Sequence, residues 1–600
     1  MMKEATVLFD NFSFTYDGAK QPALADVNLQ VQEGESILIT GPAGAGKTTL
    51  CSCLNGLVPH FFRGKIRNKV VVKGVDTRHS SIARLSHIVG LLFQDPSDQL
   101  VSPTVEDDVA FGPENYGVSR EEIHQRVMES LSLVRLSGYE KRAPYTLSGG
   151  EQQACALAGV LAMRPEVLAL DEPTSNLDPL GSKEVFDIVA RMAREGRRTL
   201  IVVEHKLEDF LPLCDRLVVM DAGRIVLLGS PQELFTGDEV QVMKERGVNI
   251  PQVSLLGLRL REEGIWPEDQ RLPITLGETQ SALESILQGA RGRTQQRSAG
   301  APGGPPKSAG GKPVLEVKNL WHTYPGGTVA LRGIDLTILE NEFVAIVGQN
   351  GSGKTTLVKH FNGLLEPTRG RVIVEGKDAG GQSVTQLSQQ VGYCFQNPDH
   401  QICCKTVREE FIFGPANLGV DEAVIRSRME EIAGRMGLEA VFEKRPFGLS
   451  KGERQKLAVA SILMMEPNVV IIDEPTTGQD YLMGREMMEL ARRLHSEGKT
   501  VIVITHDMGI VAEYVDRVVV LREGQVLLDG SAREVFMKPD VLAMTSLEPP
   551  QITRLGQELN EFGIPADVLT VEEMLREVKR ALESGRYSPL EGSEQRPGEV

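Results

Sequence analysis

The chain has 600 residues, of which 41% are hydrophobic and 24% charged, and its formal net charge is −17 at pH 7. This length predicts about three to five domains, and the negative charge argues against DNA or RNA as the main ligand. There is no apolar run of about 18 residues and no long apolar segment near the N-terminus, so we expect neither a membrane span nor a signal peptide.

Seven cysteines in a chain of this length do not predict a disulfide framework. Two of them, Cys403 and Cys404, are adjacent, but we find no further ligands at a suitable spacing. Val101 and Ser102 occupy the matching positions in the first half of the repeat described below. We therefore interpret the cysteines as packing residues rather than as a metal or redox site.

An apolar run, Ser36–Thr40, is followed by the glycine-rich segment Gly41-Pro-Ala-Gly-Ala-Gly-Lys-Thr and then by a helix-like stretch. The pattern returns in the second half, where Phe343–Val347 precedes Gly348-Gln-Asn-Gly-Ser-Gly-Lys-Thr. Glycines let the backbone N–H groups point inward around phosphate oxygens, and the helix that follows adds its positive end. Each segment therefore fits the Walker A pattern of a phosphate-binding loop (P-loop).

In each loop the lysine is expected to contact the β- and γ-phosphates of ATP, and the threonine after it to hold Mg²⁺. The nucleotide-binding residues predicted in the two loops are Gly41, Gly44, Gly46, Lys47, Thr48 and Thr49, and Gly348, Gly351, Gly353, Lys354, Thr355 and Thr356.

Two further apolar runs end in paired carboxylates, Asp171-Glu172 and Asp473-Glu474. Such runs suit central parallel strands, and the carboxyl ends of those strands are where ligands of α/β sheets bind. The aspartate of each pair can organise Mg²⁺, and the glutamate can act as general base toward the attacking water. A solvated loop after a strand is the alternative.

Histidines follow the next apolar runs at matching positions. His205 comes after Thr199–Glu204, and His506 comes after Thr500–Thr505. Two equivalent histidines at strand ends favour contact with the γ-phosphate and positioning of water, so we place both among the catalytic candidates. A purely structural role for them stays open.

The segment Leu147-Ser-Gly-Gly-Glu-Gln completes a set of motifs that resembles the ATP-binding cassette (ABC) superfamily. A serine and glycines at the start of a helix can cap a phosphate. In that superfamily this signature acts across a head-to-tail pair, on ATP held by the other cassette. The resemblance implies an α/β fold with two tandem P-loop domains. Each domain would have a mixed sheet, a small N-terminal β portion, a helical signature subdomain and a short C-terminal helical appendix.

The resemblance also implies roles for further residues. Tyr16 and Tyr324 match the aromatic residue that stacks on adenine, with plain core packing as the alternative. Gln94 and Gln396 match the glutamine that senses Mg²⁺ and couples to a membrane partner. The signature residues implied to contact ATP are Ser148, Gly149 and Gly150, and Ser450, Lys451 and Gly452.

The organisation predicted from the repeat has six parts. We expect cassettes over 1–235 and 314–538, helical appendices over 236–288 and 539–590, a flexible Gly/Ala/Pro linker over 289–313 and a disordered tail over 591–600. The linker is long enough to let the two cassettes pair within one chain.

The segments after the two glutamines narrow the resemblance. Phe93-Gln-Asp-Pro-x-x-Gln99 leads to Thr104–Asn115, and Phe395-Gln-Asn-Pro-x-x-Gln401 leads to Thr406–Asn417. These segments are similar to those of energy-coupling factor (ECF) importer ATPases, including those of the hydroxymethylpyrimidine/thiamine and cobalt importers. Such ATPases work with a transmembrane coupling subunit and a separate substrate-binding membrane subunit. The resemblance thus implies import of a vitamin or transition-metal ion, from the cytoplasmic face of the membrane.

Tandem cassettes also occur in two other functional classes. One is a soluble ATPase that acts on ribosomes, which usually carries a charged helical insert or iron–sulfur cysteines; this chain has neither feature. The other is a sugar-importer ATPase, which the segments after the glutamines disfavour.

The two halves differ in two motifs, the signature and the D-loop. The second signature reads Leu449-Ser-Lys-Gly-Glu, so Lys451 replaces a glycine, and the second D-loop, Thr477-Gly-Gln-Asp, lacks the leucine of Ser175-Asn-Leu-Asp. In a head-to-tail pair Lys451 faces the first P-loop. We expect both sites to hydrolyse ATP, the second faster, with a harmless Lys451 as the alternative.

Overall fold

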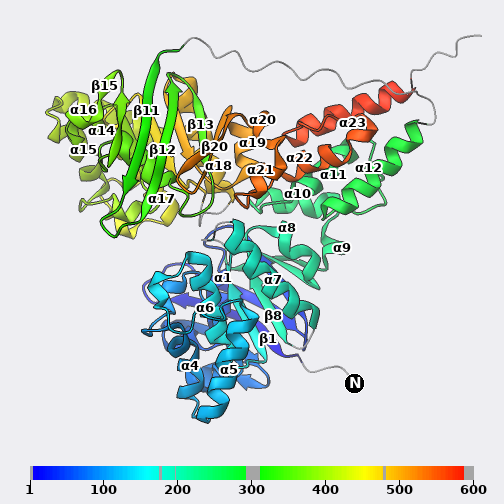
Figure 1. The fold of residues 1–600 in the computed structure, drawn as a ribbon. Coiled ribbons are helices and arrows are strands. Elements are labelled where there is room, and N and C mark those ends of the chain that lie inside the picture. Colours follow the sequence, from blue (N-terminus) through cyan, green and yellow to red (C-terminus); the bar gives the residue numbers. More distant parts are fainter. Residues whose placement is uncertain are drawn as a thin grey trace, which may run out of the picture.

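The computed structural model describes residues 5–174, 177, 179–195, 198–291, 311–476 and 481–586. The halves repeat one order of elements. Figure 1 shows the first cassette in blue to teal and the second in green to orange, while the green C-terminal helices of the first half lie beside the red ones of the second. Most of the predicted linker, the D-loops apart from Leu177, and the tail lie outside the described residues.

The elements of the first half are the strands β1 (Val7–Tyr16), β2 (Leu24–Val31), β3 (Ser36–Thr40), β4 (Gly64–Val72), β5 (Val75–Asp76), β6 (Val89–Leu92), β7 (Val167–Asp171), β8 (Thr199–Val203), β9 (Arg216–Asp221) and β10 (Arg224–Gly229), and the helices α1 (Lys47–Leu54), α2 (Leu57–His60), α3 (Ile82–Leu85), α4 (Val105–Asn115), α5 (Arg120–Leu133), α6 (Gly149–Ala162), α7 (Pro179–Glu195), α8 (Leu207–Phe210), α9 (Pro231–Leu234), α10 (Gly237–Glu245), α11 (Gln252–Glu262) and α12 (Leu276–Arg291).

The elements of the second half are the strands β11 (Pro313–Thr323), β12 (Val329–Leu339), β13 (Phe343–Val347), β14 (Arg369–Val374), β15 (Lys377–Asp378), β16 (Val391–Cys394), β17 (Val469–Asp473), β18 (Thr500–Ile504), β19 (Arg517–Arg522) and β20 (Gln525–Ser531), and the helices α13 (Lys354–Phe361), α14 (Val384–Ser388), α15 (Val407–Asn417), α16 (Glu422–Met436), α17 (Lys451–Leu463), α18 (Tyr481–Ser496), α19 (Met508–Tyr514), α20 (Ala532–Phe536), α21 (Pro539–Ala543), α22 (Gln551–Glu558) and α23 (Val571–Arg586).

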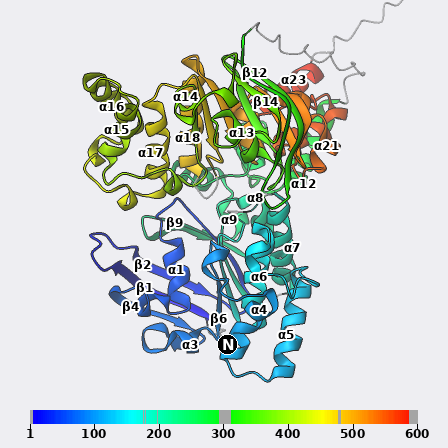
Figure 2. The same ribbon diagram turned by 60° about the vertical axis from the view of Figure 1, so that its left-hand side comes forward.

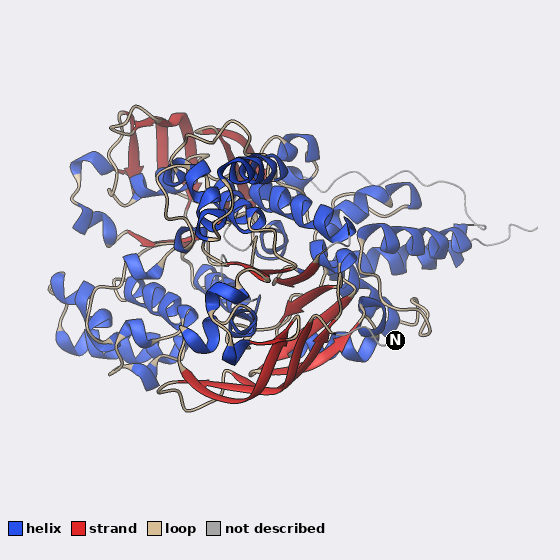
Figure 3. Ribbon diagram, turned by 90° about the horizontal axis from the view of Figure 1, so that it is seen from below, coloured by secondary structure: helices blue, strands red, loops and turns tan. Residues whose placement is uncertain are grey.

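Each half contains two sheets. The first half has an antiparallel sheet, β2-β1-β4-β5, and a larger one, β10-β9-β3-β8-β7-β6; the second half repeats both as β12-β11-β14-β15 and β16-β17-β18-β13-β19-β20. In the larger sheets all pairs are parallel except the edge pairs β9–β10 and β19–β20. The predicted mixed sheet and small N-terminal β portion are thus confirmed, and Figure 3 shows the strands gathered into sheets with helices beside them.

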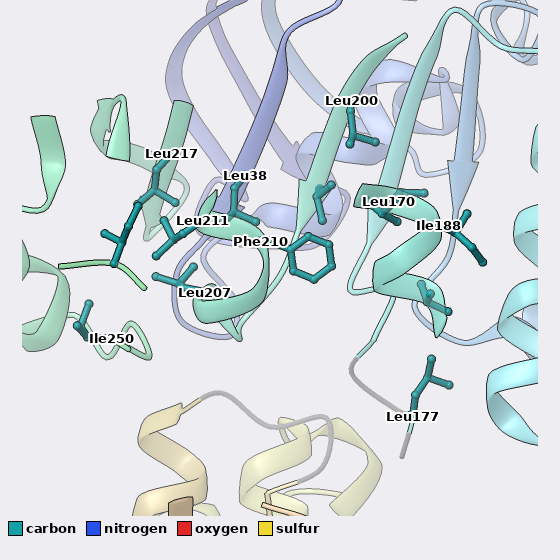
Figure 4. Packing of buried hydrophobic residues seen from close by; sticks show 14 of the residues in the cluster. Leu38, Leu170, Leu177, Ile188, Leu200, Leu207, Phe210, Leu211, Leu217 and Ile250 are labelled. Carbon is teal, nitrogen blue, oxygen red and sulfur yellow. The ribbon is translucent and has the colours of Figure 1, made fainter. Parts of the chain in front are cut away.

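The P-loop strands lie inside the larger sheets. Every residue of β3 and β13 is buried, because the apolar runs that form them are covered on both faces of the sheet. Figure 4 shows part of the core on one face, where Leu38 of β3, Leu170 of β7 and Leu200 of β8 gather around Phe210 of α8. This burial fixes the strand ends at which the P-loops and the acidic pairs begin.

A helical subdomain in each half carries the signature, as predicted. In the first half α4, α5 and α6 pack on one another through buried residues such as Val105, Leu131 and Leu157. The helices α15, α16 and α17 repeat the arrangement. Among the described residues, no helix has the length and apolar character that a membrane crossing requires.

The two helical appendices pack against each other. The helices α11 and α12 of the first appendix contact α22 and α23 of the second, and Figures 1 and 2 show them side by side. Leu555, Met574 and Val578 of the second appendix belong to the same buried cluster as Leu256 and Leu283 of the first. The sequence predicted the appendices but not their pairing, which joins the halves at one edge.

Candidate functional site

The two P-loops have the backbone that a phosphate cradle requires. Gly41, Gly44 and Gly46 have φ of 143°, 75° and 98°, and the glycines of the second loop have nearly the same values. A Cβ on Gly41 would lie 2.1 Å from the carbonyl oxygen of Met220, so only glycine fits there. These conformations turn the backbone toward the start of α1 and of α13.

The lysine of each loop folds back over it. The Nζ of Lys47 donates to the carbonyl oxygens of Gly41 and Pro42, at 2.8 and 3.0 Å. The Nζ of Lys354 does the same with Gly348 and Gln349, at 2.7 and 2.8 Å. Both lysines are buried. An ammonium held over a glycine-rich loop at the start of a helix suits the phosphates of a nucleotide.

The aspartates at the ends of β7 and β17 are buried beside the P-loop threonines. The hydroxyl of Thr355 donates to Oδ2 of Asp473 at 3.1 Å, and Thr48 bonds Asp171 in the first half. Burial, reinforced by Glu172, raises the pKa of Asp171 to about 6, and burial also raises the pKa of Asp473. Within the described residues, Oδ1 of each aspartate is buried without a hydrogen-bond partner. A buried oxygen of this kind beside a threonine hydroxyl fits a divalent cation such as Mg²⁺.

Glu172 is held by a histidine and a glutamine. Its Oε1 lies 2.9 Å from Nε2 of His205, and its Oε2 accepts from Nε2 of Gln94 at 2.6 Å. Burial favours the neutral acid, but the His205 hydrogen bond and the charges of His205, Lys47 and Lys451 outweigh it and lower the pKa of Glu172. The carboxylate is therefore ionised at neutral pH, as a general base must be.

The second half repeats this arrangement with small differences. Nδ1 of His506 lies 3.0 Å from Oε2 of Glu474. The glutamate of the second half is thus faced by Nδ1, whereas that of the first half is faced by Nε2. Gln396 is exposed at the corresponding turn. Tyr393 donates from its hydroxyl to Oδ2 of Asp473 at 2.7 Å, where the first half has Leu91.

The predicted adenine-stacking tyrosines lie at the P-loops. The hydroxyls of Tyr16 and Tyr324 pair with the hydroxyls of Thr49 and Thr356, at 3.0 and 3.1 Å. These bonds place both rings at the second threonine of each loop. Tyr324 is exposed, whereas Tyr16 is half-buried and also packs against the core of the first half.

The signature serines cap their helices. The hydroxyl of Ser148 accepts from the N–H of Glu151 at the start of α6, and Ser450 accepts from Glu453 at the start of α17. Each forms a capping box with its glutamate, which fixes the first turn of the helix. The first helical residue is Gly149 in one half and Lys451 in the other.

Lys451 of the second half lies in the electrostatic environment of the first site. Its side chain is exposed, yet desolvation by the surrounding protein lowers its pKa, and the Glu172 carboxylate is the largest opposing influence. Lys451 in turn contributes to the lowered pKa of Glu172. A signature residue of the second half therefore lies near the candidate base of the first.

Sequence reasoning missed a third buried carboxylate, Glu204, at the end of β8. It accepts from the hydroxyl of Thr174 at 2.7 Å and from the backbone N–H of His205 at 2.9 Å. Burial and the neighbouring Glu172 raise the pKa of Glu204. A comparison of the halves could have found it, because the matching residue is Thr505.

The interpretation of all cysteines as packing residues is wrong for one pair. Cys51, Cys53, Cys155 and Cys394 are buried, but Cys403 is exposed and Cys404 is half-buried. Their position after Gln401 lies on a turn rather than in the core, and sequence alone does not encode that exposure.

Comparisons with known proteins agree with this geometry. A family model described as "ABC transporter" matches residues 24–175 and 331–477. A putative ABC transporter ATP-binding protein of Caldanaerobacter subterraneus subsp. tengcongensis is 42% identical over 581 residues, which cover 96% of this chain and 100% of that protein. One of Methanosarcina acetivorans is 41% identical over 574 residues, which cover 95% of this chain and 93% of that protein.

A solved structure also matches part of the chain. It is CbiO1 from Clostridium perfringens, described as part of the ABC transporter complex CbiONQ. It is 38% identical, with a TM-score of 0.36, and the match covers 40% of this chain and 98% of that one. The curated relatives match across both halves. The chain therefore belongs to the ABC transporter family of ATP-binding proteins and is an ATPase with two cassettes in tandem.

Proposed function

We propose that this ATPase is the energy-coupling subunit of an ECF-type importer for a vitamin or a transition-metal ion. It would act at the cytoplasmic face of the membrane, bound to a transmembrane coupling subunit and a separate substrate-binding membrane subunit. The observation that carries this proposal is the segment that follows Gln94 in the first half and Gln396 in the second. In both halves a short 3₁₀ turn, Pro96–Asp98 or Pro398–His400, leads into a helix, α4 or α15.

Those helices present matching aromatic residues to solvent. Phe111 on α4 is 53% exposed and Phe413 on α15 is 52% exposed. An exposed phenylalanine at the same place in both halves suits a surface that a protein partner covers. Gln94 connects this segment to the ATP site, because it bonds Glu172. Movement at the partner surface is thereby linked to the position of the base.

In the proposed chemistry each P-loop binds one ATP. Lys47 and Lys354 hold the β- and γ-phosphates, and Tyr16 and Tyr324 contact the adenine. Mg²⁺, when bound, neutralises charge on the phosphates. The residues that would hold it are Thr48, Gln94 and Asp171 in the first site and Thr355, Gln396 and Asp473 in the second.

The two glutamates then act on water. Glu172 accepts a proton from the attacking water while His205 orients the carboxylate and the water, and Glu474 and His506 do the same in the second site. The signature of the opposite half completes each site from above the phosphates. The electrostatic influence of Lys451 and Glu172 on each other supports this head-to-tail arrangement.

The test is affinity purification of the full chain from solubilised membranes of its host. We expect integral membrane proteins to co-purify with the wild type and to be lost from the double variant Phe111→Asp/Phe413→Asp. Met544→Asp, which changes an equally exposed apolar residue in the second appendix, is the matched control and should retain them. The ATPase rate of the purified variants shows that they are folded.

Two results would count against the importer. Membrane proteins that bind the double variant as well as the wild type would show that the segments after the glutamines are not the partner surface. Co-sedimentation with ribosomes, without membrane proteins, would instead favour the alternative of a soluble ATPase that acts on ribosomes.

A further inference from the structure

Cys403, Cys404 and Glu410 form a cluster outside the ATP sites. The two thiols lie on the turn after Gln401, and Glu410 lies in the first turn of α15. One sulfur of each cysteine and a carboxylate oxygen of Glu410 all lie within 4.8 Å of one another. Glu410 is only 4% exposed, whereas Cys403 is exposed and Cys404 is half-buried. The two thiols therefore lie at the surface, next to the buried carboxylate of Glu410.

The first half shows what this turn needs for its structure alone. There the backbone N–H groups of Val101 and Ser102 both donate to Oδ1 of Asp108, at 2.9 and 2.8 Å. A carboxylate on the helix thus holds the turn without any thiol. The thiols of the second half are not required for that purpose.

The second half keeps this arrangement and adds the sulfurs to it. The N–H groups of Cys403 and Cys404 donate to Oε2 of Glu410, at 3.1 and 2.8 Å. Both amides use the same carboxylate oxygen, so the turn does not itself require Oε1. Cysteine is one of the most buried residue types, and an exposed thiol beside a second one is better suited to binding than to packing.

The sulfur separation favours a bridging cation over a disulfide. The two Sγ atoms are 4.0 Å apart. Two thiolates bound tetrahedrally at about 2.3 Å from a cation lie about 3.8 Å apart, whereas a disulfide requires about 2.05 Å. The observed separation needs almost no change to accept a cation.

We propose that Cys403, Cys404 and Glu410 bind one thiophilic divalent cation of the zinc class. Two thiolates and one carboxylate are the ligand types that such a borderline-soft cation prefers, and water would complete a tetrahedral set. The bound cation would tie the turn after Gln401 to the first turn of α15.

The test is a cadmium titration of the full, reduced and metal-free chain. Cd²⁺ is followed through its thiolate-to-metal charge-transfer absorption, which carboxylate-only sites do not produce. We expect saturation at one Cd²⁺ per chain and displacement of the band by Zn²⁺. The double variant Cys403→Val/Cys404→Ser, which installs the residues of the first half, should lose the band while it keeps the thermal stability of the wild type.

Two single variants sharpen the result. Glu410→Gln retains an oxygen that can accept from both backbone amides but loses the charge, so we expect cadmium affinity to fall about tenfold or more. Cys214→Ser removes the other cysteine that is not fully buried and should leave the titration unchanged. A wild type without a saturable band, or a band that persists in the double cysteine variant, would overturn the proposal.

Discussion

Lys451 begins α17 at the place where Gly149 begins α6. Glycine offers only its backbone N–H there, whereas lysine adds an ammonium near Glu172. Together with His205 and Lys47, that ammonium lowers the pKa of Glu172, and a weaker base takes a proton from water less readily. The second site carries glycine at the matching position, so we expect the first site to be the slower one.

Separate Glu172→Gln and Glu474→Gln variants measure this difference. Each removes a general base, which is worth about 10²–10⁴ in rate, so the remaining turnover reports the other site. We expect Glu172→Gln to retain more than half of the wild-type ATPase rate and Glu474→Gln to retain less than half. Equal residual rates would show that the two sites do not differ.

Swapping the signature residues provides the matched control. Lys451→Gly in the Glu474→Gln background should raise the residual rate, because it removes the ammonium from the first site. Gly149→Lys in the Glu172→Gln background should lower it. Among the described residues, a Cβ on Gly149 would meet only Leu177, at 3.9 Å, so the backbone there accepts a side chain.

The buried carboxylate of Glu204 is expected to lower the stability of the protein at high pH. Its pKa is raised in the folded protein, so the ionised carboxylate opposes folding at any pH above that value, and this cost disappears as the pH falls toward the ordinary pKa of a glutamate. Glu204→Gln should therefore raise the Tm at pH 8 by about 2–4 °C, which corresponds to about 1 kcal/mol for a domain of this size.

The pH dependence distinguishes this effect from better packing. The gain should shrink toward zero when the unfolding scans are repeated near pH 4.5. The Thr174 hydroxyl can turn to accept from the new amide, so the variant need not leave a buried donor unpaired. An equal gain at both pH values would contradict the explanation through ionisation.

At the scale of elements, the paired appendices are the feature that local patterns do not contain. Their helices could be expected from the apolar spacing after Pro251 and Pro550, but the partner of each apolar face could not. The contacts include ion pairs such as Arg259–Glu572, at 3.2 Å, between residues 313 apart in sequence. This pairing of the appendices buries apolar side chains of both halves in one shared core.

Truncating one side chain in the shared core tests how much this core contributes to stability. Leu555 is fully buried there, so Leu555→Ala should lower the free energy of unfolding by about 2–5 kcal/mol. Glu558→Ala changes an exposed residue on the same helix and should have an effect within about 0.5 kcal/mol. Urea unfolding of the full chain measures both, and similar midpoints would mean that the appendices contribute little.

The strand ends show how much of the site the sequence can predict. The P-loops and acidic pairs are continuous in sequence, and their chemistry requires a fixed spacing, so they could be recognised in both halves. The hydrogen bond between Gln94 and Glu172 joins residues 78 apart in sequence. It forms only because the sheet brings the two strand ends together, so the sequence alone could not predict it. Glu204 was missed because one acidic residue after an apolar run carries little signal by itself, and only its replacement by Thr505 in the second half sets it apart. The exposure of Cys403 depends on a turn rather than on residue type.

On the scale of the whole molecule, we expect ATPase activity to need both halves, because Lys451 of one acts electrostatically on Glu172 of the other. The packed appendices also join the two halves. Segments held in one chain meet at an effective concentration on the order of millimolar. Assembly of the sites should therefore be intramolecular.

Dilution tests this directly. The ATPase rate per mole of chain should stay constant when the protein is diluted from micromolar to nanomolar concentration at saturating ATP. A specific activity that falls in proportion to concentration would instead mean that active sites form between chains.

The difference between Gly149 and Lys451 has a consequence for symmetry. Two identical cassettes that pair across a twofold axis must have two equal sites, and any substitution in one site appears in the other. Joining both cassettes in one gene removes that constraint. Each signature can then change alone, and a division of labour between the two sites can be inherited.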